Sequence, residues 1–138
     1  MNIEEIKDNF DLFDDWEDKY IYLIELGKKL PDFPEREKKD ENLVKGCQSR
    51  VWLIKEPEKQ NGDLKLKFSA DSDSQIVKGL IAVLLSVYSQ KTPSEILNSD
   101  IDRILQDLEL EKHLSGNRTN GLHSMIQKIR EYAKEFIN

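Results

Sequence analysis

The residue best suited to nucleophilic chemistry in this chain is Cys47, its only cysteine. Gly46 precedes it and leaves the backbone free to turn sharply or to approach a neighbour closely. Lys45 and Arg50 place positive charge nearby, and positive charge lowers the pKa of a thiol, so the sequence predicts a cysteine prone to ionise. An apolar, β-branched segment begins at Val51, which places the thiol at the start of a strand. A buried structural cysteine is equally compatible with this spacing.

A second candidate is Arg118, which lies in the polar segment 109–119, an expected loop. Thr119 or Asn120 is the expected cap of the last helix, so Arg118 should stand just before that helix. Backbone N–H groups at a helix start favour anions, and an arginine there would add to this preference. A solvated arginine in a capped loop is the simpler interpretation of the same residues.

Metal binding is the other chemistry that the residue types allow. Cys47, His113 and His123 are of types that ligate zinc. Their spacing matches neither a zinc finger nor a zinc ribbon, so the sequence gives a zinc site little support.

Length and composition limit the functional classes. The chain has 138 residues, a net charge of −6 and a pI near 5.0, which predicts one acidic domain, residues 1–138, with a sizeable core. Acidic proteins repel phosphate backbones, so nucleic-acid binding is not expected. The longest uninterrupted apolar run, residues 80–85, is too short to cross a bilayer. An acidic N-terminus and a single cysteine favour a cytoplasmic location.

The elements that must position these residues follow from hydrophobic periodicity. The segment 75–89 is apolar nearly all round, so it should form the central buried helix. A short apolar segment, 51–54, and an alternating one, 64–68, predict an antiparallel hairpin with Pro57 in its turn. Thr92 begins a capping box, which predicts a helix start. The other expected helices cover residues 3–13, 16–30, 93–97, 100–108 and 122–136.

Three blocks of sequence form a pattern that extends over nearly the whole chain. They are DENLVKGCQS (40–49) with VWL (51–53), ADSDS (70–74) with IVKGL (76–80), and HLS (113–115) with RTNGL (118–122) and MI (125–126). Together, in this order, they resemble the SufE family, the cysteine desulfuration or sulfur-acceptor proteins of iron–sulfur cluster assembly. The chain departs from the family pattern at Arg50, where glutamine is frequent, and at residues 116–117, where a proline-containing pair is usual.

The resemblance implies an α+β fold: a small antiparallel β-sheet with helices packed against it, as in the iron–sulfur scaffold protein IscU. It also implies a role for Cys47 as the acceptor of sulfane sulfur from a persulfide on a SufS-type, pyridoxal-phosphate cysteine desulfurase. The family raises the turnover of that enzyme and passes the sulfur to an iron–sulfur scaffold complex. The pyridoxal phosphate belongs to the partner, so no cofactor is expected in this chain.

The resemblance also implies which residues surround the acceptor. Arg118 is expected near Cys47, where it assists the transfer or contacts the partner. Partner contacts are further expected from Gly46, Gln48, Ser49 and Asp73.

A sulfur carrier must shield its persulfide from stray thiols and still reach the active site of a partner. We therefore expect Cys47 in a partly sheltered loop that opens at low cost. Val44, Val51 and Trp52 are the apolar residues expected to wall the loop, and Gly46 is the expected pivot.

Two other functions are compatible with a single cysteine. A one-cysteine peroxidase would use Cys47 as its nucleophile and would need donors for the peroxide and a resolving thiol from elsewhere. An interaction module would regulate a desulfurase without accepting sulfur. Rapid peroxide consumption favours the first, and full stimulation of the desulfurase by a Cys47→Ser variant favours the second.

Overall fold

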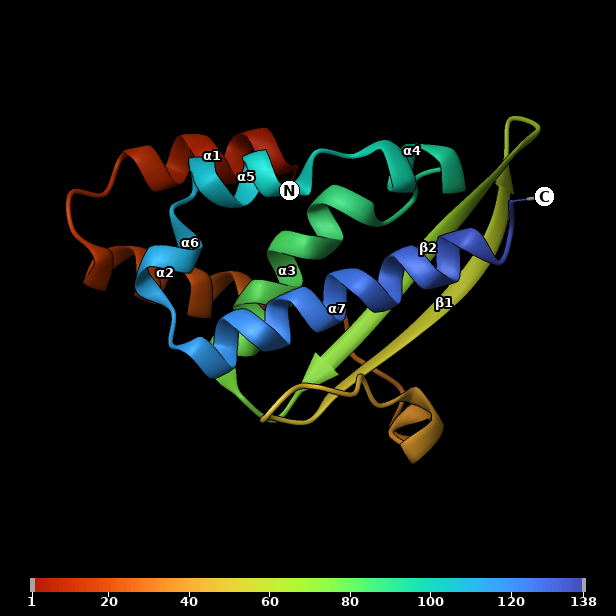
Figure 1. Cartoon of the computed structure of the whole chain (residues 1–138), viewed down its shortest axis with the longest axis horizontal. Coiled ribbons are helices and arrows are strands. Elements are labelled where there is room, and N and C mark those ends of the chain that lie inside the picture. Colours follow the sequence, from red (N-terminus) through yellow and green to blue (C-terminus); the bar gives the residue numbers. More distant parts are fainter. Residues whose placement is uncertain (1, 138) are drawn as a thin grey trace.

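The computed structural model describes residues 2–137, which form seven α-helices, two short 3-10 helices and one antiparallel hairpin, as the expected α+β class requires. Figure 1 shows the long hairpin beside α7, with the other α-helices grouped on the same side of it. The elements are α1 (Ile3–Asp11), α2 (Trp16–Lys28), η1 (Glu35–Glu37), η2 (Asp40–Asn42), β1 (Val51–Gln60), β2 (Asp63–Ser72), α3 (Gln75–Tyr88), α4 (Pro93–Asn98), α5 (Ile101–Asp107), α6 (Leu110–His113) and α7 (Gly116–Lys134). Within residues 2–137, none of the helices has both the length and the apolar character that a membrane span needs.

The hairpin is longer than the sequence predicts. β1 and β2 have ten residues each and pair along their whole length. Asn61 and Gly62 form the turn, and their positive φ angles of 53° and 87° are those of a two-residue hairpin turn. Pro57, which was expected in the turn, lies within β1 opposite Leu66. A two-stranded sheet has only edge strands, and an edge strand tolerates a proline.

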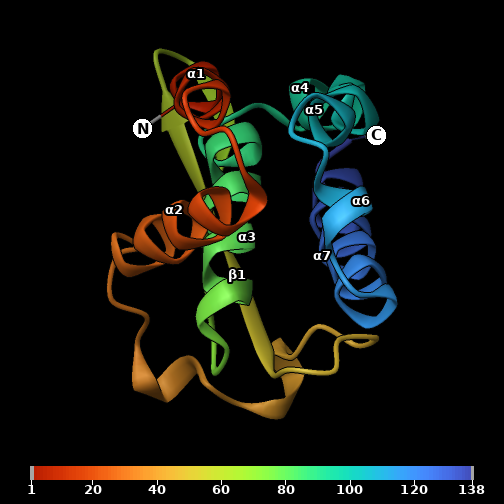
Figure 2. The ribbon, with the colours of Figure 1, turned by 90° about the vertical axis from the view of Figure 1, so that its left-hand side faces the viewer.

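Helix α3 lies at the centre of the molecule, as its composition predicts. Ser74 caps it by accepting a hydrogen bond from the Val77 N–H at 3.4 Å. Figure 2 shows α3 between α2 on one side and α7 on the other. The inner face of the hairpin joins the same core, with Leu53 of β1 buried together with Ile81 of α3 and Ile129 of α7. The core therefore fixes the hairpin, α3 and α7 relative to one another.

Helices α2 and α3 cross so closely that their backbones are almost in contact. A Cβ atom on Gly79 would overlap the carbonyl oxygen of Leu23 in α2. A Cβ atom on Gly27 would lie 2.7 Å from the backbone nitrogen of Gly79. Both positions therefore require glycine unless the two helices separate.

We expect Gly79→Ala to lower the free energy of unfolding by about 1–3 kcal/mol, the usual cost of overpacking. This loss should appear although alanine favours a helix by about 1 kcal/mol over glycine. Gly116→Ala, at the first residue of α7, is the matched control because an added Cβ there meets nothing within 4 Å. Denaturant unfolding of the three proteins is the measurement. Equal stability of the two variants would show that α2 and α3 separate without cost.

Candidate functional site

The cysteine lies in a short loop, residues 45–50, whose two ends are joined to each other. The Val44 N–H donates to the Val51 carbonyl at 2.8 Å. Leu43 and Trp52 form an isolated antiparallel bridge just outside this bond. The residues just before the cysteine loop therefore pair with the first residues of β1, and this pairing closes the base of the loop.

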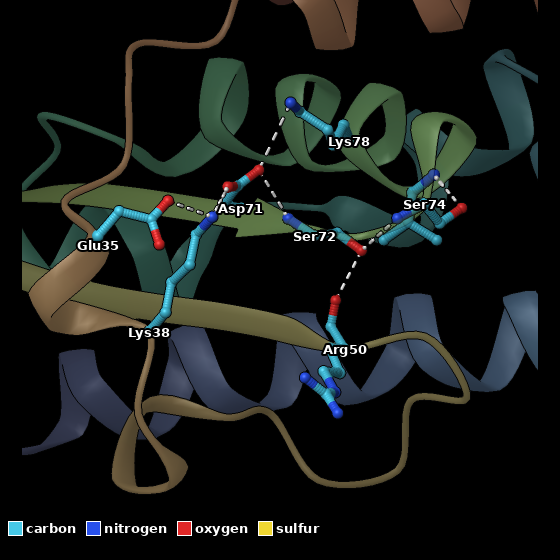
Figure 3. A network of polar contacts seen from close by, with 8 residues as sticks. Glu35, Lys38, Arg50, Asp71, Ser72, Ser74 and Lys78 are labelled. Carbon is cyan, nitrogen blue, oxygen red and sulfur yellow. Dashed lines mark hydrogen bonds and ion pairs between the residues drawn. The ribbon is translucent and has the colours of Figure 1, made fainter.

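The junction between β2 and α3 holds the last residue of the cysteine loop. The Arg50 N–H donates to Asp73 Oδ1 at 3.2 Å. The Arg50 carbonyl accepts from the Ser72 hydroxyl at 2.6 Å (Figure 3). The Ser72 oxygen also accepts from the Ser74 N–H at 3.2 Å. Among the described residues Ser72 is the only buried polar one, so its hydrogen bonds are made away from water. Asp73, expected at a partner surface, is exposed and also anchors the loop.

A second group of contacts fixes the segment that enters the loop. The Lys38 ammonium lies 2.9 Å from Glu35 and 3.2 Å from Asp71, and Lys78 lies 3.5 Å from the same aspartate (Figure 3). Hydrogen bonds to Glu35 and Asp71 raise the pKa of Lys38. Lys38 also lies 5.5 Å from the centroid of the Trp52 ring, within range of a cation–π interaction. These contacts tie the segment before the cysteine loop to both strands.

The tip of the cysteine loop rests on α7 at two points. Gly46 has a φ of 93°, and a Cβ there would overlap the Ser124 hydroxyl, so both the backbone conformation and the space require glycine. The Cys47 thiol donates a 3.5 Å hydrogen bond to the Gly121 carbonyl. A Cβ on Gly121 would lie 3.5 Å from the Cys47 sulfur, so at this position α7 presents only backbone to the thiol.

A cavity of about 320 Å³ lies beside the thiol. The cysteine loop lines it with Cys47, Gln48 and Ser49, and the first turn of α7 lines it with Asn117 and Arg118. The apolar part of its lining consists of Val51, Val77, Leu80, Leu122 and Met125. The structure therefore brings four of the expected site residues to one cavity, and Gly46 and Asp73 hold the loop that carries three of them.

The prediction that Val44, Val51 and Trp52 form the apolar wall of the loop is only partly correct. Val51 lines the cavity, but Val44 is buried in the core and Trp52 lies under Lys38 on the other face of the sheet. Val51 and Trp52 are neighbours in one strand, so their side chains point to opposite faces. Residues of α3 and α7 supply the remaining apolar contacts, which the local sequence does not reveal.

The electrostatic environment of Cys47 is the opposite of the expected one. Burial raises the pKa of the Cys47 thiol. The Gly121 carbonyl accepts a hydrogen bond that only the protonated thiol can donate. The side chains of Lys45 and Arg50, which were expected to favour a thiolate, are exposed and do not offset the burial. The expectation that the flanking cations lower the pKa of the Cys47 thiol is therefore wrong, and the closed loop favours the neutral thiol.

Arg118 reaches the cavity from a helix and not from a loop. Helix α6 and the first turn of α7 occupy most of the expected loop 109–119. Ser115 is the cap of α7, because its hydroxyl accepts from the Arg118 N–H at 3.3 Å. The prediction that Thr119 or Asn120 caps the last helix is therefore wrong, and the position of Arg118 is fixed by regular helix geometry.

The guanidinium of Arg118 is held by α2. Its Nη1 donates to the Tyr20 hydroxyl at 2.9 Å, although 98 residues separate the two. Tyr20 fits the helical periodicity of α2 as an ordinary half-buried aromatic residue, so the sequence contains no signal for this contact. Gly121 is present in the third sequence block, but only the structure shows its contact with Cys47.

The candidate zinc ligands lie apart. The His113 ring stacks on Trp16 with 4.3 Å between centroids, and His123 Nε2 lies 2.8 Å from a Glu111 oxygen. Among residues 2–137 no three His, Cys, Asp or Glu side chains are grouped so that they could hold a metal ion.

We expect Ser72→Ala to loosen the cysteine loop. The change leaves the Arg50 carbonyl without its buried donor, which should lower the free energy of unfolding by about 1–3 kcal/mol. Cys47 should then react faster with a small alkylating reagent, because the loop opens more often. Ser69→Ala, on the opposite face of the same strand, is the matched control. Equal alkylation rates in wild type and both variants would show that the loop does not depend on this hydrogen bond.

The raised pKa of Cys47 predicts a pH dependence with a definite sign. Alkylation of the native protein should rise with pH through a midpoint above about 8.5, the value of a free cysteine. The fold favours the neutral thiol, so this contribution to stability is present below about pH 8.5 and is lost as the pH rises through the folded-state pKa. Alkylation rates of native and guanidinium-unfolded protein, compared between about pH 6 and 10, are the measurement. A native midpoint at or below the unfolded one would contradict the expectation.

Three comparisons with known proteins identify the family and the fold of the chain. The family model SufE, described as an Fe-S metabolism associated domain, matches residues 4–133. Uncharacterized SufE-like proteins of Rhizobium etli and Rhizobium meliloti are each 44% identical over 133 residues, which is 96% of this chain and 90% and 95% of the respective relatives. The solution structure of a hypothetical protein from Thermus thermophilus has the same fold, with a TM-score of 0.72 at 16% identity over 96% of this chain and 93% of that one. The predicted resemblance is therefore confirmed, and the chain belongs to the SufE family.

Proposed function

We propose that this protein accepts sulfane sulfur on Cys47 from the persulfide of a SufS-type cysteine desulfurase, stimulates that enzyme, and passes the sulfur to an iron–sulfur scaffold complex in the cytoplasm. The observation that carries the proposal is the position of the single thiol, beside a cavity that Arg118 also lines, in a member of the SufE family. The protein then acts as a sulfur-transfer partner and not as a complete enzyme.

The proposed transfer resembles thiol–disulfide exchange, and its atoms balance. The Cys47 thiolate attacks the terminal sulfur of the desulfurase persulfide, the S–S bond of that persulfide breaks, and the desulfurase cysteine leaves as a thiolate. The proton that Cys47 lost is taken up by the leaving thiolate. The products are a persulfide on Cys47 and a free thiol on the desulfurase, with no net oxidation or reduction.

The neutral thiol must leave the cavity and ionise before it can attack. The contacts of the loop support such an opening, because the tip touches α7 through Gly46 and Cys47 whereas the ends are anchored at Val44 and Arg50. Lifting the tip breaks the hydrogen bond to Gly121 and leaves the anchored ends in place. Local opening of this kind costs little compared with unfolding, and it removes the burial that raises the pKa of the thiol.

The closed loop is suited to hold the product. A cavity of about 320 Å³ is larger than a second sulfur atom needs. The guanidinium of Arg118 can stabilise negative charge on a thiolate or persulfide at the same cavity. Gln48 and Ser49 add polar groups, which are available either to that charge or to the partner.

The same geometry weakens the peroxidase alternative. A peroxide-reducing cysteine reacts as a thiolate, so it sits where its pKa is lowered. Burial and the Gly121 carbonyl keep Cys47 protonated in the closed loop. Regulation of a desulfurase without sulfur transfer would leave Cys47 unused, so substitution of Cys47 distinguishes this alternative from sulfur acceptance.

Incubation with a SufS-type desulfurase and cysteine should add one sulfur atom to the peptide that contains Cys47, and a thiol reductant should remove it. Mass spectrometry of the intact protein and of its peptides is the measurement, with a sample that lacks cysteine as the control. Cys47→Ser should carry no added sulfur and should no longer stimulate the desulfurase. Full stimulation by this variant would instead support a purely regulatory role.

A further inference from the structure

The partner of the Arg118 guanidinium has a place in the proposed mechanism that no sequence motif indicates. Arg118 lines the cavity beside Cys47, and its Nη1 donates to the Tyr20 hydroxyl at 2.9 Å. Both side chains are half-buried. We propose that Tyr20 is a positioning residue, which holds the Arg118 guanidinium at the cavity so that its charge acts on the sulfur group of Cys47. This inference rests on the proposed role of Cys47 as the sulfur acceptor.

The chemistry of the phenol is important because it restrains the arginine without neutralising it. Among residues 2–137 no carboxylate lies within ion-pair distance of Arg118. A carboxylate in the place of Tyr20 would compensate the positive charge. A neutral hydroxyl acceptor leaves that charge available to an anionic thiolate or persulfide at the same cavity.

Helix α2 is a firm support for this hydroxyl. Trp16 and Tyr20 are four residues apart and therefore lie on one face of α2. The Trp16 ring stacks on His113 of α6, with 4.3 Å between centroids and 15° between the planes. The same face of α2 thus contacts α6 through Trp16 and α7 through Tyr20. The close crossing at Gly27 and Gly79 fixes α2 on the core.

Alkylation with an anionic and a neutral reagent tests the inference without a desulfurase. Iodoacetate is anionic and iodoacetamide is neutral, and their sizes are similar, so the ratio of their rates at Cys47 measures positive charge at the thiol. Arg118→Ala should lower the ratio by roughly tenfold, and Tyr20→Phe by several-fold, the order of effect of one hydrogen bond to a charged group. Tyr22→Phe is the matched control, because it removes from the same helix a hydroxyl that accepts from the Asn9 side chain at 2.9 Å. Its ratio should equal that of the wild type.

A double variant shows whether Tyr20 acts through Arg118. In the wild-type background Tyr20→Phe should lower the maximal rate of Cys47 persulfidation by the desulfurase several-fold. In the Arg118→Ala background the same change should have no further effect, either on this rate or on the alkylation ratio. If the loss in the double variant equals the product of the losses in the two single variants, Tyr20 acts through packing alone and the inference is overturned.

Thermal unfolding of each variant separates positioning from stability, since Tyr20→Phe keeps the ring and should melt close to the wild type. A folded Tyr20→Phe protein with an unchanged alkylation ratio would overturn the inference. If the ratios follow the expected order but the wild type is never persulfidated, the sulfur-acceptor proposal fails while the placement of Arg118 by Tyr20 stands.

Discussion

The crossing of α2 and α3 at Gly27 and Gly79 is the constraint on which the site depends. It brings the two backbones so close that a single Cβ would push them apart. α3 fixes the hairpin through the core, and the hairpin carries the base of the cysteine loop. α2 carries Tyr20, which reaches the guanidinium on α7. A contact between two glycines, which offers no chemistry of its own, therefore fixes the helix that carries Tyr20 relative to the core that carries the cysteine loop.

The site combines protection of a nucleophile with access to it. Protection comes from burial and from the Gly121 carbonyl, both of which favour the neutral thiol in the closed loop. Access comes from the division of the loop into anchored ends and a tip that only rests on α7. In the proposed function the reactivity of Cys47 is therefore linked to the position of the loop, because a movement that exposes the sulfur would also remove the burial that raises its pKa. A permanently ionised cysteine would need no partner to become reactive.

The sequence predicts well the features that depend on residues close together in the chain, and poorly the features that depend on contacts between distant residues. The capping box at Thr92 forms as expected, because its hydrogen bonds join residues three apart. The sequence blocks around Cys47 and Arg118 also identified the SufE family, because such a pattern is itself a stretch of sequence. The direction of the thiol pKa depends on burial against α7, and flanking charges were a misleading guide to it. The hydrogen bond between Tyr20 and Arg118 joins two residues that are 98 positions apart on different helices, and no local signal in the sequence predicts it.

The position of Pro57 within β1 has a consequence for how copies of this protein behave toward one another. A hairpin of ten-residue strands that extends past the core offers backbone groups along its outer edge, and such an edge can template strand addition and aggregation. Pro57 has no N–H, so an added strand could not complete its ladder there. The neighbouring Glu56, Glu58 and Lys59 add charges that a dry contact between edges would have to bury. Pro57, which the sequence predicts in a turn, thus hinders the pairing of the long hairpin with a second copy of the protein.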